Sequence, residues 1–458
     1  MTDIQLSPDQ QKVFAAADNW IKNCGSKPIL SIAGFAGTGK STLLGALAKK
    51  WYPAVNIAFV CFTGRAVVVL RRSLENWNVP YATSIGGSGT GSWGLDTHKT
   101  YCGTVHSLIY RPCVCREPPK PSGRQLTLTS PQFQTVRCSC NGTGFVQRAD
   151  RLPFGLIVVD EASMVHEDMA RDLESYGIPI LYVGDHGQLP PVGAMGSKVS
   201  NPDLRLEKIH RQAEGSPIIA LSQCVRTTGH LPSTVLGGSG KGVVYKARRD
   251  MNVVVKDLAY HASAQMRTSL IIGNEQTSTV GFAVITRTNS MRLLWNKLIR
   301  KARYGKDFDP MPLPGDYVIA LRNRPPIFNG MRGIVQQILG RRPLVTDLLV
   351  KFDDLPTASR VTASNFQFNR EGTFQNPAEI ENAALAKGID QETLDVPGIY
   401  WGELLDYGYA LTCHKAQGSS FDTVVLYLDK ILNPMDENNR RWLYTAVTRA
   451  KQDIIILT

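Results

Sequence analysis

The sequence predicts an α/β protein with two parallel sheets, each covered by helices on both faces. Short apolar runs recur along the chain and are continuous rather than alternating, which is typical of parallel strands buried on both faces. These runs form one early and one late cluster, so we expect two doubly wound domains. At about 150 residues per domain, the 458 residues suggest roughly three domains in all.

The runs expected to be strands share a continuous apolar centre and occupy residues 28–34, 56–62, 155–160, 178–185, 281–286, 409–413 and 453–457. Before the first of them, Ser7 and Pro8 indicate a helix start, and Gln10 stands where the second half of a capping box belongs. Gln10 therefore has a structural role available. Its amide is equally suited to hydrogen-bond an adenine edge, and position alone leaves both roles open.

Composition narrows the classes of protein. Hydrophobic residues make up 43% of the chain, which excludes a disordered or fibrous protein. No apolar run approaches the roughly 18 residues of a membrane span, and the first residues lack the features of a secretory signal. The formal charge of 51 − 39 = +12 favours a nucleic acid as partner, although solubility alone also explains a basic chain. Four of the nine cysteines crowd together, so we expect a reducing compartment, the cytoplasm.

A glycine-rich stretch, GFAGTGKST at 34–42, lies between the first expected strand and a helical apolar pattern. It fits the phosphate-loop pattern G-x-x-x-x-G-K-S, and the alternative is an ordinary glycine-rich turn. Backbone N–H groups of such a loop face the phosphates of ATP, Lys40 reaches the β- and γ-phosphates, and the Ser41 hydroxyl binds Mg²⁺. The residues expected to bind nucleotide in this stretch are Gly34, Gly37, Thr38, Gly39, Lys40, Ser41 and Thr42.

Polar residues follow two other expected strands. Asp160 is suited to hold Mg²⁺ and Glu161 to polarise the attacking water, although such a pair alone is more often a helix cap. Gln188 follows the next strand and is suited to sense the γ-phosphate, with a polar turn as the alternative. Arg449 and Arg211 are candidates to stabilise charge on the transferring phosphoryl group, although single arginines more often form surface ion pairs.

Taken together, these motifs resemble, in order, those of superfamily 1 helicases of the RecD and Dda type. The segments that carry the resemblance are LSPDQ (6–10), GFAGTGKST (34–42), FTGRAV (62–67), TVHSL (104–108), VVDEASM (158–164), GDHGQLPPV (184–192), HRQ (210–212), RTN (287–289), GDYVIALRN…FNGMRG (315–333), YALTCHKAQGSSFDTVVL (409–426) and YTAVTRAK (444–451). They span almost the whole chain.

The resemblance implies two RecA-like doubly wound parallel-sheet domains with ATP at their interface, where Arg449 and Arg211 reach across and Gln10 contacts adenine. We expect domain one at 1–108 plus 150–224, a pin at 109–149, domain two at 225–311 plus 405–458, and an SH3-like β-barrel insertion at 312–404. It also implies a DNA track, because hydroxyls, amides and cations grip phosphates without reading sequence. The residues expected to line that track are Thr63, Arg65, Thr104, His106, Asn289, Thr412, His414 and Lys415.

The cysteine cluster lies inside the expected pin. Cys113 with Cys115 and Cys138 with Cys140 supply four thiolates from two Cys-x-Cys pairs. The intervening residues are so rich in Pro, Gly and Ser that they need a bound metal to fold stably. We expect a structural Zn²⁺ there, with unligated thiols or a redox pair as the alternative. A metal in the pin departs from the resembled family.

The resulting expectation is a monomeric ATP-dependent DNA helicase that moves 5′→3′ on single-stranded DNA and opens forks, acting in replication, recombination or repair. Its architecture is similar to that of phage-encoded helicases, which places it in a bacterial host cytoplasm. The main alternative is a DNA-stimulated translocase subunit that works with replication or recombination proteins and does not unwind alone. A small-molecule kinase would not need the motifs of the second half, and a zinc-finger protein with a degenerate ATPase would not keep Lys40, Ser41, Asp160 and Glu161.

Overall fold

The description rests on a computed structural model of the 458-residue chain. The residues that it describes are 6–83, 100–112, 145–191, 197–208, 216–232, 244–247, 253–260, 262, 281–305, 309–324, 326–353, 355–394, 400–428 and 432–457.

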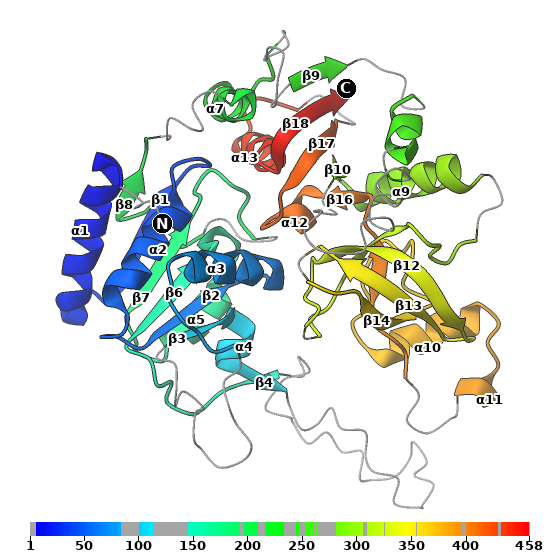
Figure 1. The fold of residues 1–458 in the computed structure, drawn as a ribbon, viewed down its shortest axis with the longest axis horizontal. Helices are drawn as coiled ribbons and strands as arrows, with labels where there is room; N and C mark the ends of the chain where they lie inside the picture. Colours follow the sequence, from blue (N-terminus) through cyan, green and yellow to red (C-terminus); the bar gives the residue numbers. More distant parts are fainter. Residues whose placement is uncertain are drawn as a thin grey trace, which may run out of the picture.

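The first sheet has six parallel strands in the order β3-β2-β6-β7-β1-β8 (Figure 1). Its strands are β1 (Ile29–Gly34), β2 (Ile57–Cys61), β3 (Thr100–Thr104), β6 (Leu156–Asp160), β7 (Ile180–Gly184) and β8 (Leu204–Leu206). Alternate strand residues face opposite sides. One side packs against α1 (Pro8–Lys22), α2 (Lys40–Trp51) and α3 (Gly64–Asn76), and the other against α4 (Val105–Ile109) and α5 (Glu167–Glu174). The predicted strands at 28–34, 56–62, 155–160 and 178–185 are confirmed, whereas β3 and β8 were missed.

The second sheet is also parallel, in the order β16-β10-β17-β18-β9. Its strands are β9 (Val244–Ala247), β10 (Phe282–Thr286), β16 (Ala410–Thr412), β17 (Phe421–Tyr427) and β18 (Ala450–Leu457). α7 (Pro217–Thr228) and α13 (Glu437–Val447) pack on one face, and α9 (Asn289–Tyr304) packs on the other. The sequence boundary at 224/225 would cut α7, but the whole helix packs with the second sheet because Ile218, Leu221 and Val225 share its core.

A third sheet is antiparallel, in the order β14-β13-β12-β11-β15. It consists of β11 (Tyr317–Ala320), β12 (Arg332–Arg341), β13 (Val345–Phe352), β14 (Ser359–Ser364) and β15 (Leu405–Tyr407), and α10 (Pro377–Ala386) and α11 (Gln391–Leu394) follow β14. It stands where the β-rich insertion at 312–404 was predicted and extends to Tyr407. Closure into an SH3-like barrel stays a prediction.

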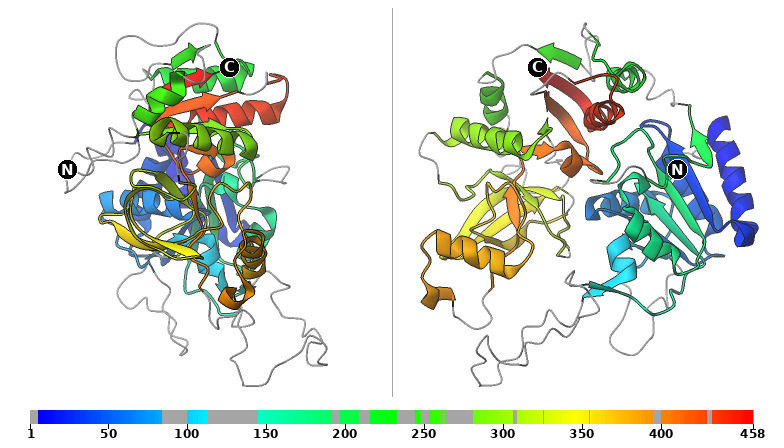
Figure 2. Two further views of the ribbon diagram at one scale, coloured as in Figure 1. Left: turned by 90° about the vertical axis from the view of Figure 1, so that its right-hand side faces the viewer. Right: turned by 180° about the vertical axis from the view of Figure 1, so that it is seen from behind.

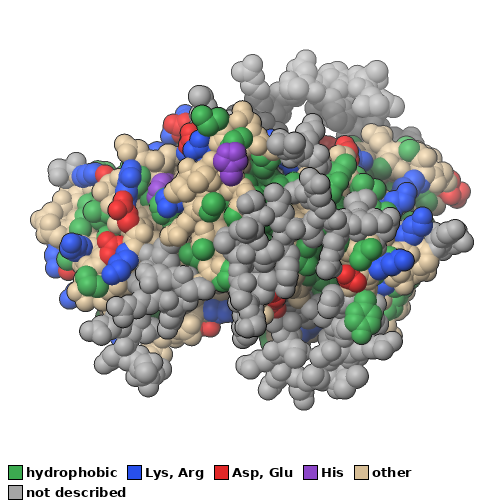
Figure 3. Space-filling model, turned by 90° about the horizontal axis from the view of Figure 1, so that it is seen from above, with side chains coloured by type: hydrophobic (Ala, Val, Ile, Leu, Met, Phe, Trp, Pro, Cys, Tyr) green, Lys and Arg blue, Asp and Glu red, His purple; other side chains and the backbone are tan. Residues whose placement is uncertain are grey.

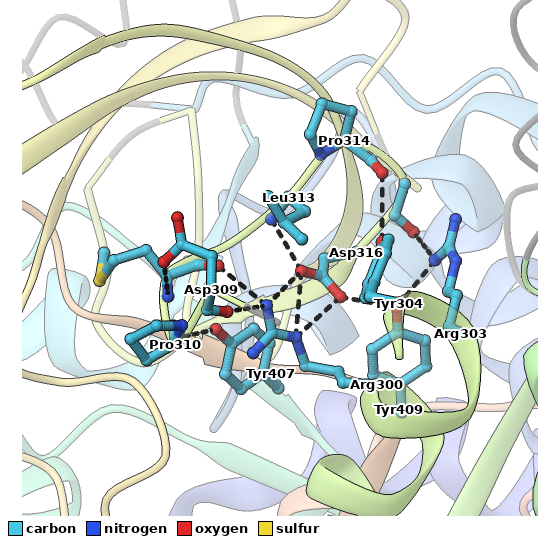
Figure 4. Close-up of polar contacts among 12 residues, drawn as sticks. Arg300, Arg303, Tyr304, Asp309, Pro310, Leu313, Pro314, Asp316, Tyr407 and Tyr409 are labelled. Atoms are coloured by element: carbon cyan, nitrogen blue, oxygen red, sulfur yellow. Dashed lines mark hydrogen bonds and ion pairs between the residues drawn. The ribbon is translucent and has the colours of Figure 1, made fainter. Parts of the chain in front are cut away.

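Buried ion pairs join the antiparallel sheet to α9. The Arg300 guanidinium donates to both carboxylate oxygens of Asp316 at 3.1 and 3.2 Å, and the Tyr409 hydroxyl donates to the same carboxylate at 2.8 Å (Figure 4). Arg292 donates to one carboxylate oxygen of Asp406 at 2.5 Å. Both sheets also share one apolar cluster. We therefore call the second and third sheets with their helices the second unit, and the first sheet with its helices the first unit (Figure 2).

A short ribbon leaves the first unit after α4. β4 (Tyr110–Pro112) and β5 (Phe145–Gln147) pair antiparallel, so they bring the two ends of segment 113–144 together. The predicted pin at 109–149 thus begins and ends on described residues, while its interior lies outside them. Among the helices that the structure describes, none is both long and apolar enough to cross a membrane.

Candidate functional site

The glycine-rich stretch forms a loop between β1 and the first turn of α2. Gly37 and Gly39 have φ of 83° and 75°, a backbone conformation that side chains disfavour, which explains the glycines. At Gly34 a side chain is excluded by space, because a Cβ there would lie 2.5 Å from Thr38 Oγ1. Ser41 is exposed at the start of α2, beside the partly buried Thr42. The loop therefore presents its backbone N–H groups at a helix N-terminus, which is a favourable place for an anion.

Gln10 lies against this loop. Its side-chain oxygen accepts from the Ser7 N–H at 3.0 Å, completing the predicted capping box, and its Nε2 donates to the carbonyl oxygen of Gly39 at 3.1 Å. The side chain is only 2% exposed. The structural role is thus confirmed, and it also ties α1 to the phosphate loop. Contact with adenine stays a prediction.

Asp185 is the centre of the polar contacts around Lys40. Its carboxylate is fully buried and accepts from the Gly187 N–H at 2.9 Å and from Gln188 Nε2 at 3.3 Å. Lys40 Nζ lies 4.0 Å from Asp185 Oδ2 and donates to the carbonyl oxygens of Gly34 and Phe35. Lys40 and Gln188 are thus brought together at the carboxyl ends of β1 and β7, as predicted from their positions after these strands.

Two further acidic side chains, Asp160 and Glu161, lie at the carboxyl end of β6. Burial, followed by the charge of Glu161, raises the pKa of Asp160 to about 7. One carboxylate oxygen of Glu161 is buried without a hydrogen-bond partner among the described residues, and Glu161 has φ of 53°. A divalent cation would offset the buried charge of Asp160, so Asp160 fits Mg²⁺, and the unpaired oxygen of Glu161 remains available to accept from a water molecule.

The second unit contacts the first at this site. The Tyr444 hydroxyl on α13 accepts from the Ala36 N–H of the phosphate loop at 2.9 Å and donates to Asp185 Oδ2 at 2.8 Å. One residue on, Thr445 Oγ1 accepts from the Leu189 N–H at 2.9 Å, and Gln417 Nε2 donates to the Leu189 carbonyl at 3.0 Å. The phosphate loop therefore lies at the junction of the two units.

Of the two arginines predicted for the junction, only Arg449 is among the described residues. Arg449 is 6% exposed and donates to the carbonyl oxygens of Thr445 and Ser419, so its side chain stays within the second unit. Arg211 lies outside the described residues. Instead, Arg226 lies 3.6 Å above the ring of Phe35 in the phosphate loop. It lines a pocket of about 370 Å³ together with Phe35, His186, Gly187, Ser200, Glu437, Arg440, Arg441 and Tyr444.

Threonines cap the helices that follow the strands of both parallel sheets. Thr63 and Thr104 are the N-caps of α3 and α4, after the neighbouring strands β2 and β3. In the second unit Thr412 is the N-cap of α12 (Cys413–Ala416), and Thr288, which the sequence analysis missed, caps α9. The segment after α12 reaches the first unit, because a Cβ on Gly418 would lie 3.0 Å from Thr63 Oγ1.

A cavity of about 880 Å³ lies between the first unit and the antiparallel sheet. Thr104 and His106 line it, and the aromatic and cationic residues on its wall are Arg71, Arg72, Tyr81, Tyr110, Arg148 and Phe328. On the face seen in Figure 3, by contrast, basic side chains are interspersed with acidic and apolar ones where described atoms are visible. The cavity wall therefore combines basic and aromatic groups.

The remaining residues predicted for the DNA track lie on both units. His414 and Lys415 follow the Thr412 cap, and burial lowers the pKa of both. Asn289 is exposed at the start of α9. Arg65 is 6% exposed and lies 5.5 Å from the centre of the Phe421 ring in β17, so it packs between the units.

Metal ligands for zinc cannot be placed. Cys113, Cys115, Cys138 and Cys140 all lie outside the described residues, and the Zn²⁺ site stays a prediction. Within the described ranges, no cluster of three or more His, Cys, Asp or Glu side chains is arranged to hold a metal ion.

Tyr444 and Thr445 are site residues that the sequence did not single out, whereas Asp185 belongs to the predicted segment GDHGQLPPV. Tyr444 lies in the segment YTAVTRAK, but its sequence position does not reveal that its hydroxyl reaches a loop about 400 residues earlier. The signal that pointed to Arg449 was its motif. Tyr444 lies about one helical turn before Arg449, and this position indicates a role at the site only when the structure shows that α13 faces the phosphate loop.

Comparison with known proteins agrees with this arrangement. The sequence model of the AAA domain family matches residues 5–237, and that of the UvrD-like helicase C-terminal domain matches residues 407–457. The ATP-dependent RecD2 DNA helicase of Deinococcus radiodurans is 26% identical over 382 residues, which cover 80% of this chain and 45% of that protein. The chain thus spans about half the length of this relative.

A second relative, the uncharacterized protein R530 of Acanthamoeba polyphaga mimivirus, is 26% identical over 185 residues, covering 39% of this chain and 32% of that protein. Among solved structures, Pif1 helicase, from a study of unwinding at forked double-stranded DNA, matches with a TM-score of 0.50 and 19% identity over 99% of this chain and 92% of that one. The AAA domain match covers more than half of the chain, so the chain belongs to that family, and together with the helicase C-terminal match and the RecD2 relative it identifies a superfamily 1B helicase of the RecD type.

Proposed function

We propose that the chain is an ATP-dependent DNA helicase that moves 5′→3′ along single-stranded DNA and separates strands at a fork. The observation that carries this proposal is the contact of Tyr444 with both Ala36 and Asp185. It places the phosphate loop at the junction of two parallel-sheet units, so that ATP bound there would touch both. Binding energy that depends on both units can drive their relative motion.

In this proposal the residues around the loop have separate tasks. The loop amides and Lys40 hold the phosphates, while Ser41 and Asp160 would hold Mg²⁺, which would supply positive charge beside the phosphoryl group. Glu161 takes a proton from the attacking water, and its buried, unpaired oxygen is suited to that task. Gln188 is 6% exposed beside Asp185 and orients the γ-phosphate end of the site. Arg226 is a candidate cation at the mouth of the loop besides Arg449 and Arg211.

DNA would cross the junction on the threonine-capped edges of both sheets. Thr63 with Thr104 belong to one unit and Thr288 with Thr412 to the other, so a change in the spacing of the units changes the spacing of the two grips. Hydroxyl and backbone amide groups hold phosphates without regard to base sequence. The aromatic and cationic wall of the 880 Å³ cavity is suited to stack on bases and pair with phosphates.

The polarity, the fork preference and the zinc-stabilised pin are parts of the proposal that rest on resemblance to RecD-like proteins. The β4–β5 ribbon supports a pin only in that both ends of segment 113–144 leave the first unit together. A translocase subunit without unwinding of its own is the alternative, because its motor would have the same site.

Strand displacement on two partial duplexes, one with a 5′ tail and one with a 3′ tail, tests the proposal in the presence of ATP and Mg²⁺. We expect unwinding from the 5′ tail only, and none by Lys40→Ala, which keeps the fold and loses the cation of the phosphate loop. Hydrolysis stimulated by DNA with neither duplex opened would favour the translocase. Unwinding from the 3′ tail alone would refute the polarity.

A further inference from the structure

Tyr444 makes the most direct link between the two units at the phosphate loop. Its ring is 1% exposed, and its edge faces the Phe35 ring at a centroid distance of 6.2 Å. The hydroxyl oxygen accepts the Ala36 N–H while its proton goes to the buried Asp185 carboxylate. Burial and the charge of Asp185 raise the pKa of Tyr444 well above its usual value, so the hydroxyl remains a donor at neutral pH.

The Ala36 N–H carries a single hydrogen and can serve one well-aligned acceptor. A phosphate oxygen is charged and accepts a stronger hydrogen bond than a neutral hydroxyl does. A nucleotide phosphate close enough to use this amide would therefore take it from Tyr444. Lys40 would make a parallel exchange, since its ammonium group now donates to the carbonyl oxygens of Gly34 and Phe35.

We propose that Tyr444 is a positioning residue whose hydroxyl competes with the nucleotide phosphate for the Ala36 N–H, so that occupation of the phosphate loop moves α13. The inference rests on the proposed function in one respect, namely that this loop binds nucleotide. It adds a residue of the second unit whose hydrogen bond to the phosphate loop depends on whether nucleotide occupies that loop.

The contacts of α13 carry the displacement onward. Thr445 Oγ1 accepts a hydrogen bond from the Leu189 N–H, and the Thr445 carbonyl oxygen accepts one from Arg449 Nε at 2.9 Å. Release of Tyr444 from the loop therefore acts on the same helix turn that retains Arg449 inside the second unit. The opposite arrangement, in which Tyr444 strengthens the loop for nucleotide, predicts the opposite sign for the experiment below.

Tyr444→Phe removes the hydroxyl and keeps the ring. Tyr409→Phe is a matched control, because Tyr409 is also fully buried in the second unit and its hydroxyl also donates to a buried aspartate, Asp316, at 2.8 Å. The affinity of each purified full-length variant for Mg²⁺–ADP is measured by calorimetry, which needs no turnover. We expect Tyr444→Phe to bind about twofold to tenfold more tightly than the unchanged protein, since the hydrogen bond from the Ala36 N–H to Tyr444 no longer competes, and Tyr409→Phe to bind as the unchanged protein does.

A second readout separates positioning from general loosening. A non-hydrolysable ATP analogue should change the affinity for single-stranded DNA less in Tyr444→Phe than in Tyr409→Phe, while thermal unfolding checks that both variants fold. Weaker or unchanged ADP affinity in Tyr444→Phe, or equal tightening in both variants, would overturn the inference. Failure of the unchanged protein to bind Mg²⁺–ADP would instead overturn the proposed function.

Discussion

The buried ion pair between Arg300 and Asp316 allows a quantitative prediction about the second unit. Arg300 and Asp316 are 2% and 0% exposed, and Asp316 also accepts from the Leu313 N–H at 2.8 Å. In Figure 4 the two side chains point at each other from α9 and the start of β11. Asp316→Asn keeps the shape but removes the negative charge, which leaves the Arg300 charge buried without its counter-ion.

Loss of one partner from a buried ion pair costs about 3–5 kcal/mol of unfolding free energy. For a unit of roughly 150–250 residues, each kcal/mol lowers Tm by about 2–4 °C, so we expect a decrease of roughly 6–20 °C. Thermal unfolding followed by circular dichroism measures it. The pair of Asp168 with Arg171 serves as the control, since Asp168 is 87% exposed and Asp168→Asn should change the free energy by less than about 1 kcal/mol. Equal effects of the two substitutions would refute the reasoning.

Three further predictions concern the phosphate site, the second sheet and the pin. The Asp160 pKa of about 7 means that Mg²⁺ must displace a proton at lower pH, so Mg²⁺–ADP affinity should rise from about pH 6 to about pH 8, and calorimetry at about pH 6 should show proton release on binding. A flat affinity profile would contradict this prediction. Removal of 453–458 deletes the buried side chains of β18, which lies between β17 and β9, and should lower the unfolding free energy of the second unit by about 5–9 kcal/mol. Urea unfolding of the truncated chain should show that the second unit no longer folds, and a truncated chain that still folds this unit would refute the prediction. Cys138→Ser with Cys140→Ser should release one Zn²⁺ per chain by metal analysis and reduce unwinding more than ATP hydrolysis, whereas equal loss of both would indicate misfolding.

Local sequence was most informative where one physical cause determines the outcome. The capping box of Ser7 with Gln10 formed as predicted because its partners are three residues apart. Gly37 and Gly39 are required by positive φ, and the apolar strands β1, β2, β6 and β7 needed only hydrophobic burial. β3 was missed because TYCGT has no continuous apolar run; its pairing with β2 and the packing of α3 and α4 make it a strand.

Long-range contacts were beyond local reasoning. Tyr444 and Asp185 meet although 259 residues separate them, and α7 joined the second sheet because its apolar face matches α13 and β18. Arg449 illustrates the same limit, since its motif predicts a role but its neighbours Thr445 and Ser419 hold the side chain inside the second unit.

The sequence by itself determined the α/β class, the phosphate loop, the acidic pair after β6 and the order of motifs, because each depends on residues close together in the chain. Only the tertiary structure decided which groups face one another across the junction: Tyr444 on Ala36, Arg226 on Phe35, and Arg65 on Phe421. The physical reason is that a hydrogen bond or a ring contact depends on distances of a few ångströms, and between distant segments the packing of the two units sets those distances.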